Sequence, residues 1–351
     1  MSHLQEDIAR ESLLTLLDGE LLGEKRAESL MNAVMEGKVP PIQLAGILVA
    51  LRFMGEREEE LTGLARAMRN RVYREMTPFV PANYHEIKDS VVDTCGTGGD
   101  GAGTFNISTA TAMVVAAAGV PVAKHGNRAV SGKAGSADVL EALGLAVDCS
   151  PEKSFQCLMK TGFGFFFAPQ CHRAMAHAGP VRRELGVPTL FNLLGPLTNP
   201  AGAKRQLVGV NRPERVELMA RVLRGLGVTK ACVVHGHGGL DELTLTGPSQ
   251  VAFLKEGEIE NTLIDPKDYG FSYCHIEEVT GGTKEENAAI LEKIFYGEKG
   301  PQRDIVVLNA GATFYVADIV SDLREGIALA EVTIDSGNVI ALLQKIRTFM
   351  Q

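Results

Sequence analysis

The stretch Cys95-Gly-Thr-Gly-Gly-Asp-Gly-Ala-Gly-Thr-Phe-Asn-Ile-Ser-Thr109 (loop one) decides the fold class of this chain. It follows the short apolar run Ser90–Thr94, which predicts a strand, and it leads into Ile107–Ala118, which predicts a helix. Five glycines within eight residues let the backbone turn sharply and point N–H groups inward. The polar residues at the start of the helix add unpaired N–H groups and the positive end of the helix dipole. The stretch therefore predicts an anion-binding loop between a strand and a helix.

A second loop, residues 124–136 (loop two), repeats this arrangement. It follows the apolar run Val120–Lys124, which predicts a strand, and it opens the predicted helix Gly135–Leu143. Its basic side chains lie within ten residues of one another: Lys124, His125, Arg128 and Lys133. Loop two predicts the basic part of an anion site, with a solvated basic turn as the simpler alternative.

A third loop, His235–Glu242 (loop three), follows the predicted strand Ala231–His235. Its adjacent carboxylates, Asp241 and Glu242, suit Mg²⁺, which takes oxygen ligands and completes its shell with phosphate oxygens and waters. A surface acidic turn is the alternative. Zinc held with His235 is disfavoured, because the polar residues are so local and no distant third ligand is evident.

The three loops share one position relative to their strands. Each leaves the carboxyl end of a predicted strand, and right-handed crossovers make such strands parallel. We therefore expect the loops to open on one sheet edge, where the ligand sites of α/β proteins lie. Loop one is neither a Walker loop, since no Gly-Lys-Ser/Thr closes it, nor a dinucleotide fingerprint, since its glycine spacing differs.

The chain of 351 residues predicts two domains. Residues 1–75 show only helical periodicity, with gaps at glycines and prolines, and predict a small bundle. Its four helices are expected at Leu4–Leu17, Leu21–Met35, Ile42–Met54 and Glu56–Arg74. Residues 76–351 alternate strands with helices and predict an α/β domain with a mostly parallel central sheet. The helical, leucine-rich stretch Val181–Leu194 is expected to pack back onto the bundle.

Further strands and helices of the α/β part follow from the same patterns. Strands are expected at Leu145–Cys149, Phe163–Ala168 and Gln206–Val210, and a helix is expected at Arg215–Leu226. The tail from Glu285 onward is expected to be mainly helical. The pair Arg182-Arg183 opens the returning segment; it predicts surface ion pairs, or a guanidinium that grips a substrate carboxylate in a bidentate manner.

Composition narrows the function classes. The net charge of −8 argues against nucleic-acid and anionic-membrane partners. The longest apolar run, Ala110–Val122, falls short of the roughly 20 residues that span a bilayer. Six scattered cysteines predict reduced thiols. Since the first residues show no signal pattern, we expect a cytoplasmic protein.

Five sequence words, in order, resemble the anthranilate phosphoribosyltransferase family over essentially the whole chain. They are Asp93-Thr-Cys-Gly-Thr-Gly-Gly-Asp-Gly, Phe105-Asn-Ile-Ser-Thr, Lys124-His-Gly-Asn-Arg-Ala-Val-Ser, Phe191-Asn-Leu-Leu-Gly-Pro-Leu-Thr-Asn-Pro200 and Gly239-Leu-Asp-Glu-Leu. The resemblance implies a nucleoside-phosphorylase type of fold with the site between the two domains. It also implies transfer of the phosphoribosyl group of 5-phosphoribosyl 1-diphosphate (PRPP) to anthranilate, a step of tryptophan biosynthesis.

The resemblance also implies roles for residues of this chain. PRPP would be bound by Gly96, Gly99, Asp100, Thr104, Asn106, Ile107, Ser108, Thr109, Lys124, His125, Gly126, Asn127, Arg128, Ala129, Val130, Ser131, Gly132 and Ser136. Anthranilate would contact Gly96, Asn127 and Arg182. Magnesium would be held by Ser108, Asp241 and Glu242. The family often has serines where this chain has Ala129 and Gly132, so backbone N–H groups would have to serve at those two positions.

The implied chemistry needs electrostatic stabilisation of departing pyrophosphate rather than a strong base, because an aromatic amine is neutral at pH 7. No general base is assigned. The family resemblance further implies a homodimer formed through the helical domain. The alternatives are an enzyme like the pyrimidine nucleoside phosphorylases and a non-catalytic homologue that binds nucleic acid. An enzyme of the first kind should have a different sequence in loop two. A homologue of the second kind should lack some of the site motifs or carry a net positive charge.

Overall fold

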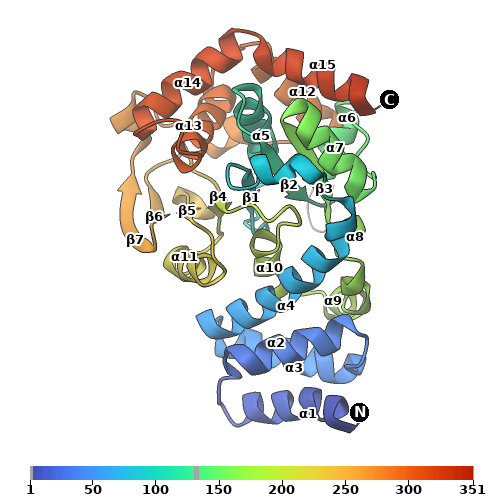
Figure 1. The fold of residues 1–351 in the computed structure, drawn as a ribbon. Coiled ribbons are helices and arrows are strands. Elements are labelled where there is room, and N and C mark those ends of the chain that lie inside the picture. The colour runs from blue at the N-terminus through green and yellow to red at the C-terminus, as the bar shows by residue number, and fades with distance from the viewer. Residues whose placement is uncertain (1–2, 130–133, 351) are drawn as a thin grey trace.

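The computed structural model describes residues 3–129 and 134–350. Figure 1 shows two parts arranged end to end, with the N-terminal helices at one end and a sheet covered by helices at the other. The helical bundle and the mixed but mostly parallel sheet confirm the predicted fold class.

The N-terminal part consists of α1 (His3–Leu17), α2 (Gly23–Met35), α3 (Pro41–Met54) and α4 (Glu58–Met76). Proline opens α3, where the missing N–H costs nothing, and Gly55 ends it with a positive φ of 83°. α2 packs along α4 and α1 packs along α3. The four helices predicted from the sequence are confirmed, with ends that differ by a few residues.

The sheet has the order β3-β2-β1-β4-β5-β6-β7. The first five strands are parallel: β1 (Val92–Gly96), β2 (Val122–Gly126), β3 (Phe163–Phe167), β4 (Arg205–Gly209) and β5 (Lys230–His235). β6 (Ser249–Lys255) and β7 (Glu258–Ile264) extend it as an antiparallel hairpin, which the sequence patterns above did not predict. The strand order reverses between β1 and β4, which is where ligands bind in open α/β sheets.

Helices cover both faces of the sheet, as Figure 1 shows. The connecting helices are α5 (Ile107–Ala117), α6 (Ser136–Ala142), α7 (Pro151–Thr161), α8 (Ala168–Cys171), α9 (Gly179–Leu185), α10 (Phe191–Leu197) and α11 (Arg215–Gly225). The C-terminal helices are α12 (Lys284–Phe295), α13 (Pro301–Val316), α14 (Leu323–Asp335) and α15 (Asn338–Met350). Short 3-10 turns occur at Thr77–Phe79, Ala82–Glu86, Arg173–His177, His237–Gly239, Pro266–Tyr269 and Ile276–Val279.

Two of the predicted elements are wrong. Leu145–Cys149 is not a strand, although Leu145 and Val147 are buried and alternate with exposed residues. The alternation reflects packing against the core, because no neighbouring strand pairs with this segment. Val181–Leu194 is not one helical segment either. α9 ends at Gly186, which has a positive φ of 63°, and α10 begins only at Phe191.

Opposite faces of the sheet belong to different cores. One core joins one face of the sheet to α5, α6 and the C-terminal helices, and the other joins the opposite face to α10, α11 and the N-terminal bundle. α9 packs on α3 and α10 packs on α4. Within residues 3–129 and 134–350 no single helix is long and apolar enough to cross a membrane, and the bent pair α14–α15 meets that test only when both helices are taken together.

Candidate active site

Loop one crosses the carboxyl ends of β1 and β4 in a conformation that needs its glycines. Gly98 and Gly99 have φ values of 67° and 75°, a region that side chains disfavour. Nδ2 of Asn211, two residues after β4, donates to the carbonyl oxygens of Gly98 and Gly99 at 3.1 Å each. The N–H of Gly98 donates to Oδ2 of Asp241 at 2.7 Å. Loop one is therefore held in place by residues that follow two other strands.

Asp241 of loop three lies between two glycines at the ends of neighbouring strands. A Cβ atom at Gly96 would overlap the carboxylate of Asp241, and a Cβ at Gly209 would overlap its backbone carbonyl. Gly96 and Gly209 are register partners in the parallel pair β1–β4. The lack of side chains at these two positions is what lets an acidic residue reach the base of loop one.

Glu242 faces the N-terminus of α5. Its Oε1 accepts a hydrogen bond from the N–H of Ser108 at 3.1 Å, where the helix dipole favours a negative charge. Lys124, buried at the end of β2, donates from Nζ to the carbonyl of Thr94 at 2.6 Å and to Oγ of Ser108 at 3.2 Å. The three residues proposed to hold magnesium, Ser108, Asp241 and Glu242, thus all contact loop one or the helix that follows it.

The electrostatics of these carboxylates suit the binding of a cation. Burial and the neighbouring Asp100 raise the pKa of Asp241 to about 7. Burial and the charge of Asp241 raise the pKa of Glu242 well above its ordinary value. Burial also lowers the pKa of Lys124, whose single amine faces two carboxylates. Two desolvated carboxylates with open coordination suit a divalent cation that shares its shell with phosphate oxygens.

The histidines of loop three are not arranged as zinc ligands in the described structure. Nδ1 of His235 lies 2.9 Å from the carbonyl of Val210, and Nδ1 of His237 lies 3.5 Å from Oγ1 of Thr246. In the part of the chain that the structure describes, no group of three or more His, Cys, Asp or Glu residues is arranged to hold a metal ion. Zinc needs three or four protein ligands of this kind, so the donor set fits magnesium better.

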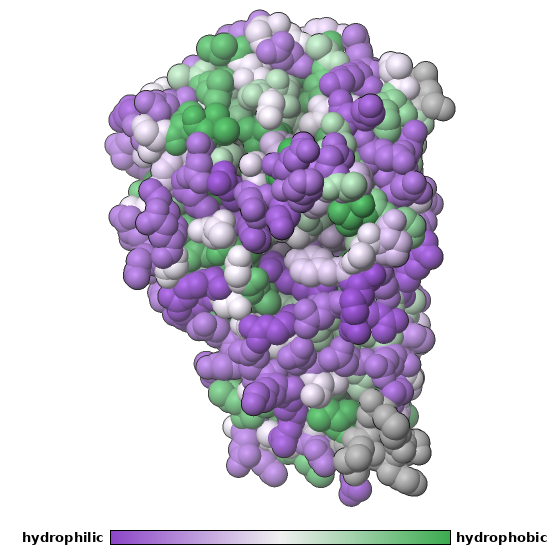
Figure 2. All heavy atoms as spheres, viewed as in Figure 1, coloured by the Kyte–Doolittle hydropathy of each residue, from purple (hydrophilic) through white to green (hydrophobic). Residues whose placement is uncertain are grey.

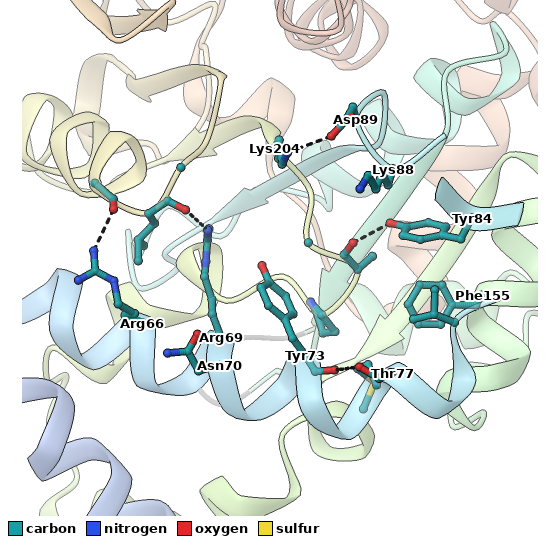
Figure 3. A pocket seen from close by; sticks show the side chains of 18 residues that line it. Arg66, Arg69, Asn70, Tyr73, Thr77, Tyr84, Lys88, Asp89, Phe155 and Lys204 are labelled. Atoms are coloured by element: carbon teal, nitrogen blue, oxygen red, sulfur yellow. Dashed lines mark hydrogen bonds and ion pairs between the residues drawn. The ribbon is translucent and has the colours of Figure 1, made fainter. Parts of the chain in front are cut away.

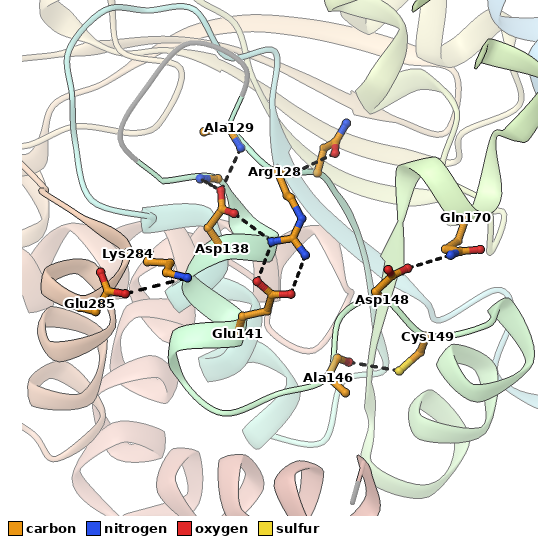
Figure 4. Close-up of polar contacts among 12 residues, drawn as sticks. Arg128, Ala129, Asp138, Glu141, Ala146, Asp148, Cys149, Gln170, Lys284 and Glu285 are labelled. Atoms are coloured by element: carbon orange, nitrogen blue, oxygen red, sulfur yellow. Dashed lines mark hydrogen bonds and ion pairs between the residues drawn. The ribbon is translucent and has the colours of Figure 1, made fainter.

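Loop two is fixed at its flanks by one carboxylate. Oδ2 of Asp138 accepts the N–H of Ala129 at 3.0 Å and the N–H of Gly135 at 2.8 Å (Figure 4). Arg128 pairs with Asp138 and, through two 2.6 Å bonds, with Glu141. The proposed PRPP residues Val130, Ser131 and Gly132, together with Lys133, lie outside the described residues.

The sequence predicted loop two as a free basic patch, and the structure changes that interpretation. Lys124 is buried beneath loop one, and the guanidinium of Arg128 is already paired with two carboxylates. Asn127 is exposed, and its carbonyl accepts the hydroxyl of Ser136 at 3.3 Å. A Cβ at Gly126 would overlap that same hydroxyl, so the start and the end of loop two are in contact.

The segment 191–200 contacts the strands and residues from which loops one and two begin. Asn199 donates from Nδ2 to Oδ2 of the buried Asp93 at 2.7 Å, and Oδ1 of Asp93 accepts the N–H of His125 at 3.3 Å. Nδ1 of His125 lies 3.1 Å from the carbonyl of Gly195. The motif Phe191–Pro200 therefore supports the two loops. This structural role explains why the motif occurs together with them in the sequence.

Neither arginine of the pair forms an ion pair with a described residue, but Arg182 is the one that is partly buried. It lies on α9 with its guanidinium carbon 5.2 Å from the ring centre of Phe191 on α10. Among the described residues it forms no ion pair, and burial alone lowers its pKa. Arg183 is exposed beside Gly179. A half-buried guanidinium without a carboxylate is a site that an anionic ligand can complete.

The remaining proposed residues have structural contacts of their own. Thr104 bridges to Thr280, and the carboxylate of Asp100 accepts the N–H of Ala102 at 3.2 Å. Asn106 stands before α5 without capping it: Nδ2 donates to the carbonyl of Ala134 at 3.1 Å, and Oδ1 accepts from Asn287 of α12 at 2.9 Å. Ile107 and Thr109 are buried in the core side of α5.

Sequence reasoning missed the residues that hold the loops from outside. The sequence patterns did not identify Asn211 or Asp138 as site residues. Asn211 follows a predicted strand, however, and therefore lies at the same sheet edge. A cavity of about 200 Å³ lies beside loop one, and its lining includes Arg52, Asp100, Pro188, Asn192 and Arg215. Arg215 donates to Oδ1 of Asn211 at 2.7 Å and pairs with Glu56 of the helical part. This chain of contacts links the helical part to loop one.

Comparisons with known proteins agree with this geometry. Residues 10–72 match the model of the glycosyl transferase family, helical bundle domain, and residues 88–340 match that of the glycosyl transferase family, a/b domain. The anthranilate phosphoribosyltransferase of Acetivibrio thermocellus is 48% identical over 342 residues, which is 97% of this chain and 96% of that protein.

Solved structures show the same likeness. The crystal structure of anthranilate phosphoribosyltransferase from Thermus thermophilus matches with a TM-score of 0.87 at 44% identity, over 97% of this chain and 99% of that chain. The Saccharomyces cerevisiae enzyme, solved in complex with PRPP and Mg, matches with a TM-score of 0.85 over 97% of each chain. At 24% identity, the latter is a likeness of fold.

Proposed function

The chain belongs to the anthranilate phosphoribosyltransferase family, and we propose that it transfers the phosphoribosyl group of PRPP to anthranilate. The products are N-(5-phosphoribosyl)anthranilate and pyrophosphate, and the reaction is a step of tryptophan biosynthesis. The observation that carries this proposal is the meeting of three loops at one sheet edge around two adjacent carboxylates, the partly buried Asp241 and the buried Glu242. That arrangement suits a magnesium–pyrophosphate group beside an acceptor.

The donor is bound mainly by backbone groups and short polar side chains. In this proposal Gly96, Gly99, Asp100, Thr104 and Asn106–Thr109 hold the pyrophosphate end, with the N-terminus of α5 adding its dipole. Loop two, from Lys124 to Gly132, and Ser136 close over the ribose phosphate. Arg128 has to exchange part of its pairing with Glu141 for a phosphate contact, which an exposed ion pair permits at small cost.

The metal contribution rests on Ser108, Asp241 and Glu242, which fit Mg²⁺ as described above. When bound, Mg²⁺ would supply positive charge next to the leaving pyrophosphate oxygens. Asp241 is oriented for this by the N–H of Gly98, and Glu242 is oriented by the N–H of Ser108. The bond from ribose C1 to pyrophosphate breaks as the bond from C1 to the anthranilate nitrogen forms, and the amine then loses a proton.

The acceptor is positioned by its carboxylate. We assign that contact to Arg182, which has no ion pair among the described residues, and we assign orientation of the ring and amine to Gly96 and Asn127. The guanidinium already stacks on Phe191, so it loses less freedom on gripping a carboxylate than an extended side chain would. No strong base is needed, because the attacking amine is neutral.

Movement of two domains completes the site in this proposal. Residues 1–75 form the helical domain, onto which 181–194 pack, and residues 76–351 form the donor-binding domain. Contacts across the boundary include the ion pair of Glu56 with Arg215 and a 2.6 Å bond from Arg52 to the carbonyl of Pro188. Closure along this boundary would exclude the water that otherwise hydrolyses the donor.

A homodimer is part of the proposal. α1 and α3 pack side by side and leave large apolar side chains exposed. Phe53 is 92% exposed and Ile42 is 87% exposed. The further exposed members of this surface are Leu14, Leu17, Leu21 and Val49. A second copy that buries this surface would remove a large apolar area from water. We also infer that the enzyme works in the cytoplasm, where its six free thiols stay reduced.

The deciding experiment mixes the purified protein with anthranilate, PRPP and Mg²⁺ and follows the loss of anthranilate fluorescence. We expect turnover that requires all three, together with release of pyrophosphate. Phosphorolysis of a pyrimidine nucleoside without anthranilate turnover would overturn the proposal. The variant Arg182→Ala should raise the KM for anthranilate about tenfold or more, with little change for PRPP, since a charge-assisted pair is lost. Arg183→Ala is the matched control and should behave like the unchanged protein.

A further inference from the structure

A cavity of about 700 Å³ lies at the sheet edge opposite to the three loops. Asp89, Lys204 and Gly227 in its lining come just before the amino ends of β1, β4 and β5. Its other wall is the C-terminal part of α4 from Arg66 onward, together with Thr77 after the helix (Figure 3). The cavity is therefore built from both parts of the molecule, at the segments that connect them, and its size is that of a small-molecule site.

Arg69 places a buried positive charge in this cavity. Its side chain is only 7% exposed. Nε donates to the carbonyl of Leu197 at 2.5 Å and Nη1 to the carbonyl of Leu226 at 2.8 Å, at the ends of α10 and α11. Among the described residues no carboxylate lies within ion-pair distance, and Nη2 donates to none of them. A desolvated cation that is met only by carbonyl dipoles favours an anionic partner.

The surrounding charges keep the cavity positive. Arg66 pairs with Glu24, and Lys204 pairs with Asp89 at 3.0 Å. Lys88 forms no ion pair with a described carboxylate. Asp89 is the one acidic side chain in the described lining, against four basic ones. Figure 2 shows that the face of the molecule over α4 is largely hydrophilic, in keeping with a polar ligand.

The other side presents the exposed ring of Tyr73, next to the buried rings of Tyr84 and Phe155. Tyr84 and Phe155 meet edge to face with ring centres 5.1 Å apart. The hydroxyl of Tyr84 donates to the carbonyl of Ala201 at 2.6 Å, which fixes the ring. Tyr73 projects from α4 between these rings and the arginines (Figure 3). A tyrosine ring stacks on a planar ligand at low cost in conformational entropy.

We propose that this cavity binds a small aromatic carboxylate. Its ring would lie against the exposed ring of Tyr73, and its carboxylate would meet Arg69 and Lys88. A bare inorganic anion would leave the ring of Tyr73 unused, and a neutral aromatic would leave the cations unpaired. An aromatic acid of amino-acid size uses both halves of the lining.

Binding at this place would reach the loops through α10. Arg69 contacts the last residue of α10, and α10 also presents the carbonyl of Gly195 to His125 and that of Pro196 to Gln206 of β4. An occupant held between α4 and the α/β part resists relative movement of the two, so it should slow turnover. Binding of the aromatic carboxylate does not depend on the activity proposed above. Only the predicted slowing of turnover rests on that proposed function.

The test is isothermal titration calorimetry of the full chain with 3-phenylpropanoate, with and without saturating anthranilate. We expect one site per chain that anthranilate does not displace. Propanoate, which lacks the ring, and 2-phenylethanol, which lacks the charge, should bind at least about tenfold more weakly, since each forfeits one half of the lining. In the rate assay the compound should lower kcat without raising the KM for anthranilate.

Two variants locate the site. Lys88→Gln and Tyr73→Ser remove one contact each from partly exposed positions and should weaken binding about tenfold. Lys345→Gln, an exposed lysine on the distant α15, is the matched control and should bind as before. Absence of binding at millimolar concentrations, displacement by anthranilate, or unchanged affinity in both cavity variants would overturn the proposal. A calorimetric signal that persists when turnover cannot be detected would separate this proposal from the assigned activity.

Discussion

Loops one and two look equivalent in the sequence, yet the structure holds them in different ways. Loop one is fastened by side chains that follow two other strands: Asn211 and Asp241 bond its backbone, and the buried Glu242 bonds the first turn of α5. Loop two is fastened at the surface by Asp138 and by the exposed pairing of Arg128 with Glu141 (Figure 4). A hydrogen bond to a buried carboxylate such as Glu242 is costly to break, whereas an exposed ion pair such as that of Arg128 with Glu141 contributes little.

This difference separates a preformed seat from an adjustable cover. The seat has to present N–H groups in fixed positions before the donor arrives, because stabilisation of the leaving group depends on preorganisation. Under the proposed function, loop two would admit the donor and then lie over it. Four substitutions test this difference between the two loops.

Asp241→Asn should have the largest effect. The amide removes the negative charge that suits Mg²⁺ and weakens the bond to Gly98, so kcat/KM should fall by about 10²–10³-fold. The Mg²⁺ concentration for half-maximal rate should rise. Steady-state kinetics over a Mg²⁺ series measures both, and Glu285→Gln, an exposed carboxylate, is the control. An unchanged Mg²⁺ profile would remove the metal role from loop three.

Gly96→Ala should come next. The new Cβ overlaps the carboxylate of Asp241, so either loop one or loop three must shift, and kcat/KM should fall about 10²-fold. Gly195→Ala is a matched control, because a Cβ there meets open space. Kinetics together with the midpoint of thermal unfolding distinguish a displaced site from a general loss of stability. Full activity of Gly96→Ala would show that loop one can shift without loss of function and is not a preformed seat.

Asp138→Ala tests the cover. It frees the N–H groups of Ala129 and Gly135 and one partner of Arg128, so the KM for PRPP should rise about tenfold while kcat changes little. Asp138→Asn keeps an acceptor oxygen, so its KM for PRPP should lie between those of the unchanged protein and Asp138→Ala. A loss of kcat as large as that of Gly96→Ala would mean that loop two is also part of the fixed seat.

Glu141→Gln should have the smallest effect. It removes the strongest partner of Arg128, but the pair is exposed, so the free energy of unfolding should change by less than about 1 kcal/mol. The KM for PRPP should change by less than about threefold, or fall slightly as Arg128 becomes free for phosphate. Chemical denaturation and donor-titration kinetics measure the two quantities. A severe loss would contradict the adjustable cover.

The sequence predicted the placement of the loops well because strand ends and glycine clusters are local signals. It failed where the outcome depends on distant partners. Lys124 looks like a surface charge until Thr94 and Ser108 enclose it. Asp138 looks like an ordinary helix residue until the backbone of loop two folds onto it. Neither relation is visible in a window of adjacent residues.

Of the errors in the predicted elements, only the false strand has this origin. Leu145–Cys149 alternates as a strand does, but alternation reports burial and not hydrogen bonding. The hairpin β6–β7 was missed although Glu256 and Gly257, both with positive φ, form a two-residue turn between the strands. There the signal was present and local. The break between α9 and α10 likewise follows from Gly186 and Pro188.

Gly96 and Gly209 constrain how this sequence can change over evolutionary time. While Asp241 is retained, neither glycine can acquire a side chain, because each Cβ would occupy space that the aspartate already fills. If Asp241 were lost, both positions would become free to drift, and a return to aspartate would then require reverting them first. The three positions should therefore vary together among descendants of this chain, so that a side chain at 96 or 209 marks a lineage that has abandoned the acidic centre.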